Sequence, residues 1–207
     1  MGFENAIMNL ILEPEACYEL MEAITDFRIK ALPYIKKYLN PDIYTICDDV
    51  AHETGTFISP QMYHDLVMPH HKRLLDEVKK LGMIPSIHCC AKGETMVPYF
   101  IEAGAKIYTP VASTNDIETL LDTYGDRIVI SGGYDFNGRP GNEDTPVEEI
   151  LAEVQRCFDT YAKHGSYMFM GSVLTTTPEN TMAKMLPLIK KSMELARTTP
   201  AVHRPAK

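Results

Sequence analysis

The sequence lacks the features that mark membrane, secreted and nucleic-acid-binding proteins. Acidic residues outnumber basic ones by 28 to 20, and the formal net charge of −8 argues against binding to nucleic acid or anionic lipid. No apolar run reaches the roughly 18 residues that a membrane helix needs. A basic N-terminal segment is also missing, since Glu4 stands where a signal peptide is positively charged. We therefore expect a cytoplasmic protein that binds neither nucleic acid nor membrane.

The cysteines do not have the number or the spacing that indicates disulfides. The chain of 207 residues has five cysteines, an odd number, without the spacing of a disulfide framework. Cys89 and Cys90 are adjacent, so a disulfide between them would be strained. We expect reduced thiols, some of them buried and one of them a candidate metal ligand.

From residue 43 onward, short apolar runs alternate with long amphipathic segments. This alternation is typical of buried parallel strands in βαβ units. The preceding residues look mostly helical, with one segment that opens at Glu13-Pro14-Glu15 and runs to about Leu39. The predicted strands are Ile43–Cys47, Ile84–His88, Lys106–Pro110, Ile128–Ser131 and Tyr167–Met170.

The starts and ends of several helices are marked in the sequence. Glu148 follows Thr145 by three residues, which predicts a capping box. Gly82 is expected to end the helix before it. Three predicted helices begin with a capping hydroxyl followed by a proline at the first helical position, at Ser59-Pro60, Thr145-Pro146 and Thr177-Pro178.

Alternating strands and helices form either an open doubly wound sheet or a closed barrel. The five units average about 31 residues, close to the roughly 250 residues that eight units occupy in a barrel. Five units are too few to close one. The segment 198–207 is proline-rich and without periodicity, so we expect a flexible tail there.

In a parallel α/β fold, functional residues gather at the carboxyl ends of the strands. Three of the five predicted strand ends carry a carboxylate, an imidazole or a thiol. This clustering favours a site at that edge of the sheet. The residues at the five ends are Cys47-Asp48-Asp49, His88-Cys89-Cys90, Tyr108-Thr109-Pro110, Gly132-Gly133-Tyr134-Asp135 and Gly171-Ser172.

His88 and Cys90 are the sharpest pair of candidate ligands. Residues two apart along a strand point to the same face, so both can reach one metal ion while Cys89 points towards the helices. An imidazole with a thiolate suits zinc. The alternative is a small buried thiol beside a hydrogen-bonded histidine, because free cysteine is commonly a buried apolar residue.

The other polar residues allow both functional and structural interpretations. Asp48 and Asp49 could hold a metal, accept a hydrogen bond from a substrate or act as a general base, or they could simply cap the loop. The segment 52–56 begins like a zinc-protease motif, but threonine stands where the second histidine is required. His70-His71, next to two basic residues, is expected on a helix surface. Gly132-Gly133 lacks the spacing of a dinucleotide site.

Several of these segments follow one another in the order of a known family. They are Asp48-Asp49, Phe57–Tyr63, Pro69–Leu74, Ile87–Cys90, Glu102–Ala105, Tyr124–Ile128, Gly132–Asp135 and Thr177–Asn180. The series resembles the uroporphyrinogen decarboxylase superfamily, and above all its branch of corrinoid-dependent methyltransferases. The resemblance extends from residue 3 to about residue 197.

The resemblance implies a (β/α)₈, or TIM, barrel in which Ile43–Asp49 is the fourth strand and Tyr167–Gly171 is the eighth. Residues 1–197 would then be the C-terminal part of the barrel, with about five βα units corresponding to strands 4–8. The first three strands of the family have no counterpart in this sequence. They carry the arginine-rich porphyrin-binding segment and the catalytic aspartate of true decarboxylases.

The resemblance also implies a site. In the methyltransferase branch, zinc is held by a His-x-Cys pair and by a later cysteine near the eighth strand. His88 and Cys90 match the pair, whereas Ser172 stands at the later position. Asp48 and Asp49 are the implied catalytic residues. The residues implied for substrate binding are Tyr108, Gly132, Gly133 and Asp135.

The implied activity is transfer of a methyl group to a thiol or similar small molecule, with zinc as cofactor. The methyl donor would be a methylated corrinoid held by a partner protein. One alternative is decarboxylation of a uroporphyrinogen-like tetrapyrrole, with Asp48 or Asp49 meeting the pyrrole N–H groups. Another is a chain that is inactive until a homo-oligomer or a companion chain supplies the first three βα units.

Overall fold

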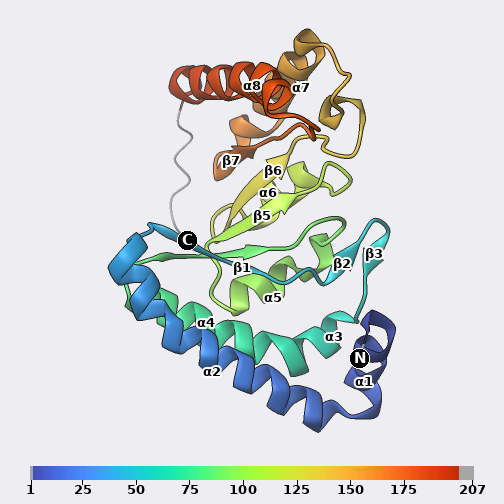
Figure 1. Cartoon of the computed structure of the whole chain (residues 1–207), viewed down its shortest axis with the longest axis vertical. Coiled ribbons are helices and arrows are strands. Elements are labelled where there is room, and N and C mark those ends of the chain that lie inside the picture. The colour runs from blue at the N-terminus through green and yellow to red at the C-terminus, as the bar shows by residue number, and fades with distance from the viewer. Residues whose placement is uncertain (1, 201–207) are drawn as a thin grey trace. The chain divides into compact units, whose positions relative to one another are not determined.

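The computed structural model describes residues 2–200 (Figure 1). The chain divides into two compact units, with the boundary between Tyr108 and Thr109. The elements of the first unit are α1 (Phe3–Leu12), α2 (Pro14–Leu39), β1 (Ile43–Cys47), β2 (Ala51–His52), β3 (Gly55–Thr56), α3 (Pro60–Met62), a π-helical turn (Tyr63–Val67), α4 (Met68–Lys80), β4 (Ile84–His88), a 3₁₀ turn (Glu94–Met96) and α5 (Val97–Glu102).

β5 (Ile107–Val111) runs across the boundary between the units. The elements of the second unit are α6 (Ile117–Tyr124), β6 (Val129–Gly133), a 3₁₀ turn (Arg139–Gly141), α7 (Val147–Tyr161), a 3₁₀ turn (Ala162–His164), β7 (Tyr167–Met170) and α8 (Pro178–Thr198).

The five long strands form one parallel sheet in the order β1-β4-β5-β6-β7, and β2 and β3 form a separate hairpin. Each long strand leads into a helical segment, so the chain has five consecutive βα units. Over residues 2–200 the sheet stays open between its outer strands, β1 and β7. The predicted α/β fold, an incomplete barrel of five units, is confirmed.

The predicted strands agree closely with the observed ones. β1, β4 and β7 have the predicted bounds, and β5 is displaced by one residue. β6 was predicted to end at Ser131, but it continues because Gly132 and Gly133 pair with Phe169 and Met170 of β7. The long N-terminal helix begins and ends where the sequence predicted. Of the predicted tail, Thr198 belongs to α8, while residues 201–207 lie outside the described part.

Two of the three predicted helix caps are confirmed. Ser59 Oγ accepts a hydrogen bond from the Met62 amide at 3.1 Å, and Thr177 Oγ1 accepts one from the Asn180 amide at 3.2 Å. The capping box at Thr145 was wrong. Its buried hydroxyl donates to the carbonyl of Arg139 in the preceding 3₁₀ turn, and α7 begins only after Pro146.

Loss of the Ser59 cap should weaken the helix that carries His71. We expect Ser59→Ala to lower the free energy of unfolding by about 1 kcal/mol, because the Met62 amide loses its acceptor. Urea denaturation measures the change. Ser192→Ala is the matched control, since that hydroxyl lies within α8 and caps nothing. Equal midpoints for the two variants would contradict the capping role.

The helical segment from Pro60 to Lys80 contains one wide turn. The Met68 amide bonds to the Tyr63 carbonyl five residues back, and the following Pro69 has no amide hydrogen for a regular α-helical bond. In an α-helix, residues eight apart are rotated by about 80° from each other. Because a π turn rotates less per residue, it removes much of this offset. Tyr63 and His71 therefore lie on one face.

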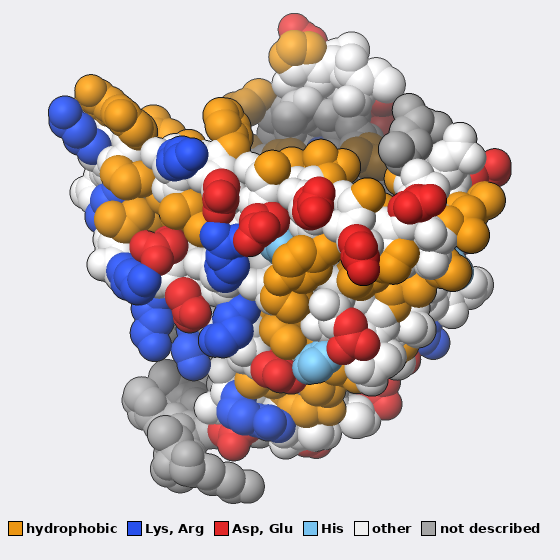
Figure 2. Space-filling model, turned by 90° about the horizontal axis from the view of Figure 1, so that it is seen from below, with side chains coloured by type: hydrophobic (Ala, Val, Ile, Leu, Met, Phe, Trp, Pro, Cys, Tyr) orange, Lys and Arg blue, Asp and Glu red, His pale blue; other side chains and the backbone are white. Residues whose placement is uncertain are grey.

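In the first unit, α2 and α4 run side by side (Figure 1). They are joined by an ion pair between Arg73 Nη2 and Asp26 Oδ1 at 2.6 Å. Figure 2 shows one face of the molecule, on which basic side chains lie among acidic and hydrophobic ones. Within residues 2–200, none of the helices combines the length and the apolar character of a membrane span.

Candidate metal centre

Asp49, His88 and Cys90 meet at the carboxyl ends of β1 and β4. His88 Nε2 lies 2.9 Å from Cys90 Sγ and 3.5 Å from Asp49 Oδ1. The three ligand atoms all lie within 4.8 Å of one another. Among residues 2–200, no other group of three histidine, cysteine or acidic side chains has this arrangement.

The pairing of β1 with β4 explains why these residues meet. The strands are parallel, and Cys47 stands opposite His88 in the register. Asp49 and Cys90 each follow two residues later, so they reach the same level beyond the sheet. A hydrogen bond from the Cys90 amide to Asp49 Oδ1, 2.7 Å long, ties the two strand ends together.

The donor set fits zinc. Imidazole nitrogen, thiolate sulfur and carboxylate oxygen are the three kinds of side-chain ligand that zinc takes. In a tetrahedral zinc site, two ligand atoms (nitrogen, sulfur or oxygen) lie roughly 3.3–3.6 Å from each other. The distance from His88 Nε2 to Asp49 Oδ1, 3.5 Å, is already in this range. The distance from His88 Nε2 to Cys90 Sγ, 2.9 Å, would have to increase only slightly.

The electrostatics of the cluster favour a bound cation. Burial, and then the nearby Asp49 carboxylate, raise the pKa of the Cys90 thiol to about 11. The thiol therefore keeps its proton at neutral pH unless a positive charge arrives. A metal ion supplies that charge and displaces the proton when the sulfur binds it.

Asp48 points into a different environment from its neighbour Asp49. His71 Nε2 lies 2.9 Å from Asp48 Oδ2, and Arg28 Nη1 donates to the same oxygen at 3.2 Å. On the other side of the imidazole ring, His71 Nδ1 lies 2.8 Å from the Tyr63 hydroxyl. A chain of hydrogen bonds thus runs from the fully buried Tyr63 to the half-exposed Asp48.

The protonation of Asp48 and Tyr63 in this series of hydrogen bonds depends on burial and on neighbouring charges. Burial alone would raise the pKa of Asp48, but the hydrogen bond and charge of His71, with the charge of Arg28, hold it below its usual value. Burial raises the pKa of Tyr63, so its hydroxyl keeps its proton within the hydrogen bond to His71 Nδ1. The Asp48 carboxylate is therefore ionised and fixed in place.

The prediction of a surface position for His70 and His71 was wrong. Both side chains are buried, because α2 packs against this face of α4. The His70 ring lies against the Tyr18 ring, with centroids 4.4 Å apart, and neither of its nitrogens has a hydrogen-bond partner. Burial lowers the pKa of His70.

Tyr108, predicted to bind substrate, is fully buried at the end of the first unit. Its ring packs against Phe100, with centroids 5.2 Å apart, and its hydroxyl has no hydrogen-bond partner. That oxygen lies only 2.6 Å from the point where a Cβ on Gly93 would be. Contact between this hydroxyl and a substrate stays a prediction.

Gly132 and Gly133, in the second unit, have a structural reason to be glycine. Gly132 has a φ of +143°, and a Cβ there would lie 2.4 Å from the backbone oxygen of Val111. Gly133 has a φ of +81°, and a Cβ there would lie 2.5 Å from the Tyr161 ring. The close packing of β6 therefore accounts for both residues, and their role in substrate binding stays a prediction.

Asp135 organises the loop after β6. Its Oδ1 accepts hydrogen bonds from Ser113 Oγ and from the Gly138 amide, both at 3.1 Å. Its own amide donates to Glu153 Oε1 at 3.1 Å. Binding of a substrate by this carboxylate also stays a prediction. Ser172 Oγ, at the position of the later cysteine, lies 3.9 Å from Met185 Sδ.

The segment 52–56 is a β-hairpin, since β2 and β3 pair antiparallel around its turn. A zinc-protease motif requires a helix there, so the geometry gives a second reason against that interpretation. His52 instead hydrogen-bonds within the turn, with Nδ1 3.2 Å from Thr54 Oγ1, and its ring packs against Phe57.

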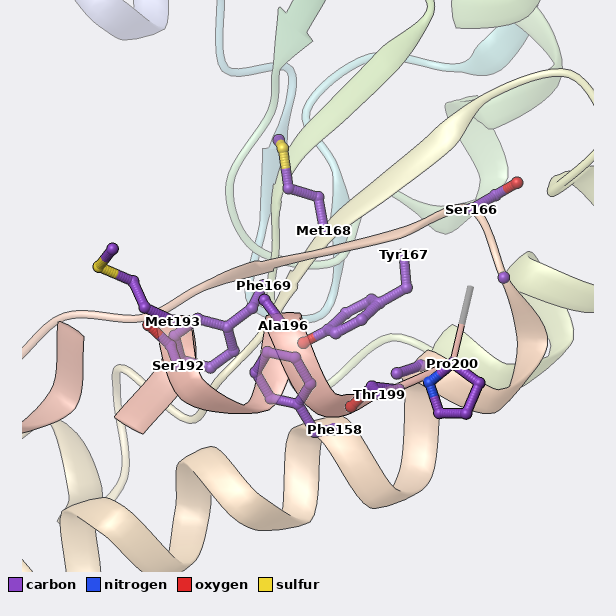
Figure 3. Close-up of a pocket in the computed structure, with 12 residues that line it drawn as sticks. Phe158, Ser166, Tyr167, Met168, Phe169, Ser192, Met193, Ala196, Thr199 and Pro200 are labelled. Carbon is purple, nitrogen blue, oxygen red and sulfur yellow. The ribbon is translucent and has the colours of Figure 1, made fainter. Parts of the chain in front are cut away.

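A hollow of about 540 Å³ in the second unit has no acidic, histidine or cysteine side chain among its lining residues (Figure 3). Figure 3 shows Phe158, Tyr167 and Phe169 along it, and the rings of Phe158 and Phe169 stack with centroids 5.5 Å apart. The Tyr167 hydroxyl already donates to the Gly132 carbonyl at 2.8 Å. This hollow offers apolar surface and hydroxyl groups but no charged side chain.

Four residues around the two aspartates were not identified as functional from the sequence. Tyr63, His71 and Arg28 come from helices, and only the fold brings them to Asp48. The buried pairing of Tyr63 with His71 depends on the wide turn, which a regular helical pattern does not reveal. Cys47 was recognised from the sequence only as a residue at a strand end. Its position opposite His88 became visible from the register of β1 with β4.

Comparisons with known proteins identify the family and the fold. Residues 1–192 match the family model described as uroporphyrinogen decarboxylase (URO-D). A methylated-thiol–coenzyme M methyltransferase from Methanosarcina mazei is 27% identical over 161 residues, which is 75% of this chain and 40% of that protein.

A solved structure, a methyltransferase from Methanosarcina mazei, shares the fold with a TM-score of 0.67 at 13% identity. The alignment covers 93% of this chain and 53% of the solved one. The chain thus spans about half of the length of these relatives, which are methyltransferases. Because the family model covers more than nine-tenths of its residues, the chain belongs to the uroporphyrinogen decarboxylase family.

Proposed function

We propose that this chain carries the zinc-binding part of a methyltransferase, which moves a methyl group from a methylated corrinoid protein to a thiol. The observation that supports this most is the cluster of Asp49, His88 and Cys90 at the strand ends. Nitrogen and sulfur donors in contact are the set that zinc favours. The curated relative is named for a methylated thiol, which supports a sulfur compound as the substrate class.

His88, Cys90 and Asp49 would hold the metal. When bound, zinc would lower the pKa of a thiol substrate and so favour the thiolate, which is the nucleophilic form. Asp48 would keep the end of β1 in place through its bonds to His71 and Arg28. Asp49 is half exposed, so it borders the solvent-accessible side of the cluster, from which a small molecule would enter.

The proposed reaction is a transfer of one methyl cation equivalent. The substrate thiol first loses its proton to solvent. Its sulfur then forms a bond to the methyl carbon, and the cobalt–carbon bond breaks with both electrons left on the cobalt. The corrinoid is the methyl donor in this proposal, and its carrier protein is the proposed partner.

The two aspartates argue against the alternative of tetrapyrrole decarboxylation. That reaction would need Asp48 or Asp49 to receive pyrrole N–H groups. Asp48 is already held by His71 and Arg28, and Asp49 by the Cys90 amide and His88. Their carboxylates thus serve two separate networks, which suits a cation site better than one carboxylate aimed at a macrocycle.

The activity is proposed for a larger barrel to which this chain contributes five βα units. The outer strands β1 and β7 are where further strands would join. A homo-oligomer or a companion chain would supply them, if they are not part of the same polypeptide. Assays of methyl transfer therefore need the chain both by itself and together with such a partner.

The test compares bound zinc in the wild type and in His88→Ala, with methyl transfer from methylcobalamin to thiols measured in parallel. We expect the wild type to bind one zinc per chain and the variant to lose it, with a loss of transfer. His64→Ala is the control, because that histidine is exposed and paired with Asp65 away from the cluster. Equal zinc content in wild type and His88→Ala would refute the ligand assignment.

A further inference from the structure

We propose that Cys47 supplies a second thiolate to the metal centre, so that its protein ligands are Cys47, His88 and Cys90 together with Asp49. This inference rests on the proposed zinc site and names a ligand that neither the sequence pattern nor the family resemblance assigns. It would make the centre complete within the first unit, without the later position where this chain has Ser172.

The strand register places Cys47 next to His88. The two are paired across the parallel strands β1 and β4, each as the last residue of its strand. Side chains alternate along a strand, and the preceding residues, Ile46 and Ile87, are buried at 1% and 2% exposure. Cys47 and His88 therefore both point to the opposite face, where Cys47 is exposed.

The four side chains form two parallel pairs. Cys47 and Asp49 are two residues apart at the end of β1, and His88 and Cys90 are two apart at the end of β4. The Cys47 thiol stands outside the group of three ligand atoms that lie within 4.8 Å of one another, so this exposed side chain must turn towards the centre to bind.

The chemistry favours a second sulfur at this point. With Cys90 as its only thiolate, the centre would carry one soft donor, whereas zinc sites commonly combine two cysteines with histidine. Two thiolates also neutralise the charge of Zn²⁺. The other cysteines are elsewhere: Cys17 lies on α2, Cys157 is buried in α7, and the buried Cys89 thiol is directed to the Cys90 carbonyl at 3.7 Å.

The test measures the metal itself and needs no enzyme activity. Zinc affinity of the full chain is determined by competition with a chelator for the wild type, Cys47→Ser and Cys47→Ala. The same proteins are loaded with Co²⁺, whose thiolate-to-metal charge-transfer absorption grows with the number of sulfur ligands. Intensity is expressed per bound cobalt, so variants that bind less metal are still compared by the number of their sulfur ligands, and circular dichroism confirms that each variant is folded. Cys17→Ser is the matched control.

We expect both Cys47 variants to bind zinc about 10- to 100-fold more weakly than the wild type, and their charge-transfer absorption to fall by about half. Cys17→Ser should match the wild type in both. Unchanged affinity and absorption in the Cys47 variants, with zinc bound by the wild type, would overturn this inference and leave the proposed function intact. A wild type that binds no zinc would overturn both.

Discussion

Gly132→Ala should destabilise the second unit by about 3 kcal/mol or more. The residue lies inside β6 with a φ of +143°, which a residue with a side chain rarely adopts. An added Cβ would also meet backbone atoms of Val111 at 2.4 and 2.5 Å, and backbone cannot rotate away as a side chain can.

Equilibrium denaturation of the purified variant measures this effect. Gly55→Ala is the control, because Gly55 has no positive φ and a Cβ there would have no heavy atom within 4 Å. We expect that control to change the unfolding free energy by less than about 1 kcal/mol. Equal unfolding midpoints for Gly132→Ala and Gly55→Ala would contradict the conclusion that the Val111 backbone excludes a side chain at position 132.

His71→Ala is the second substitution with a large expected effect: it should lower the free energy of unfolding by about 2–4 kcal/mol. The side chain is only 7% exposed and hydrogen-bonds both Tyr63 and Asp48. Its removal leaves the buried Tyr63 hydroxyl without a partner, opens a cavity and frees the Asp48 carboxylate. Thermal or urea denaturation of the metal-free protein measures the loss.

A double-mutant cycle separates the hydrogen bond from general packing. Tyr63→Phe, His71→Ala and the double variant should show a coupling energy of about 0.5–3 kcal/mol, because the two residues share one hydrogen bond. His64→Ala gives the cost of losing an exposed histidine from the same helical segment. Strictly additive losses for Tyr63→Phe and His71→Ala would show that the hydrogen bond contributes nothing to stability.

The sequence was sufficient for most of the fold because the relevant signals are local. Apolar runs between helical segments located all five long strands, and Ser59 and Thr177 marked helix starts correctly. The errors occurred where a contact with another element outweighed the preference within the element. Thr145 caps no helix because the Arg139 carbonyl takes its hydroxyl, and β6 extends through two glycines because β7 pairs with them.

The candidate site was only partly accessible from sequence. The two-residue spacing of His88 and Cys90 indicated a shared face, and the structure places their ligand atoms 2.9 Å apart. Nothing in the spacing of Asp48 and Asp49 shows that adjacent carboxylates serve different networks. That separation depends on His71, which looked like a surface residue because two basic residues follow it in the chain.

The wide turn at Tyr63–Val67 bears on how relatives of different length should be aligned. Residues seven apart in a regular α-helix are rotated by only about 20°, nearly the same direction that the π turn gives to residues eight apart. The turn thus accommodates one additional residue while Tyr63 and His71 stay in contact. A homologue with one residue fewer in this segment would keep the tyrosine–histidine pair on an unbroken helix, so a gap placed here is compatible with the same network.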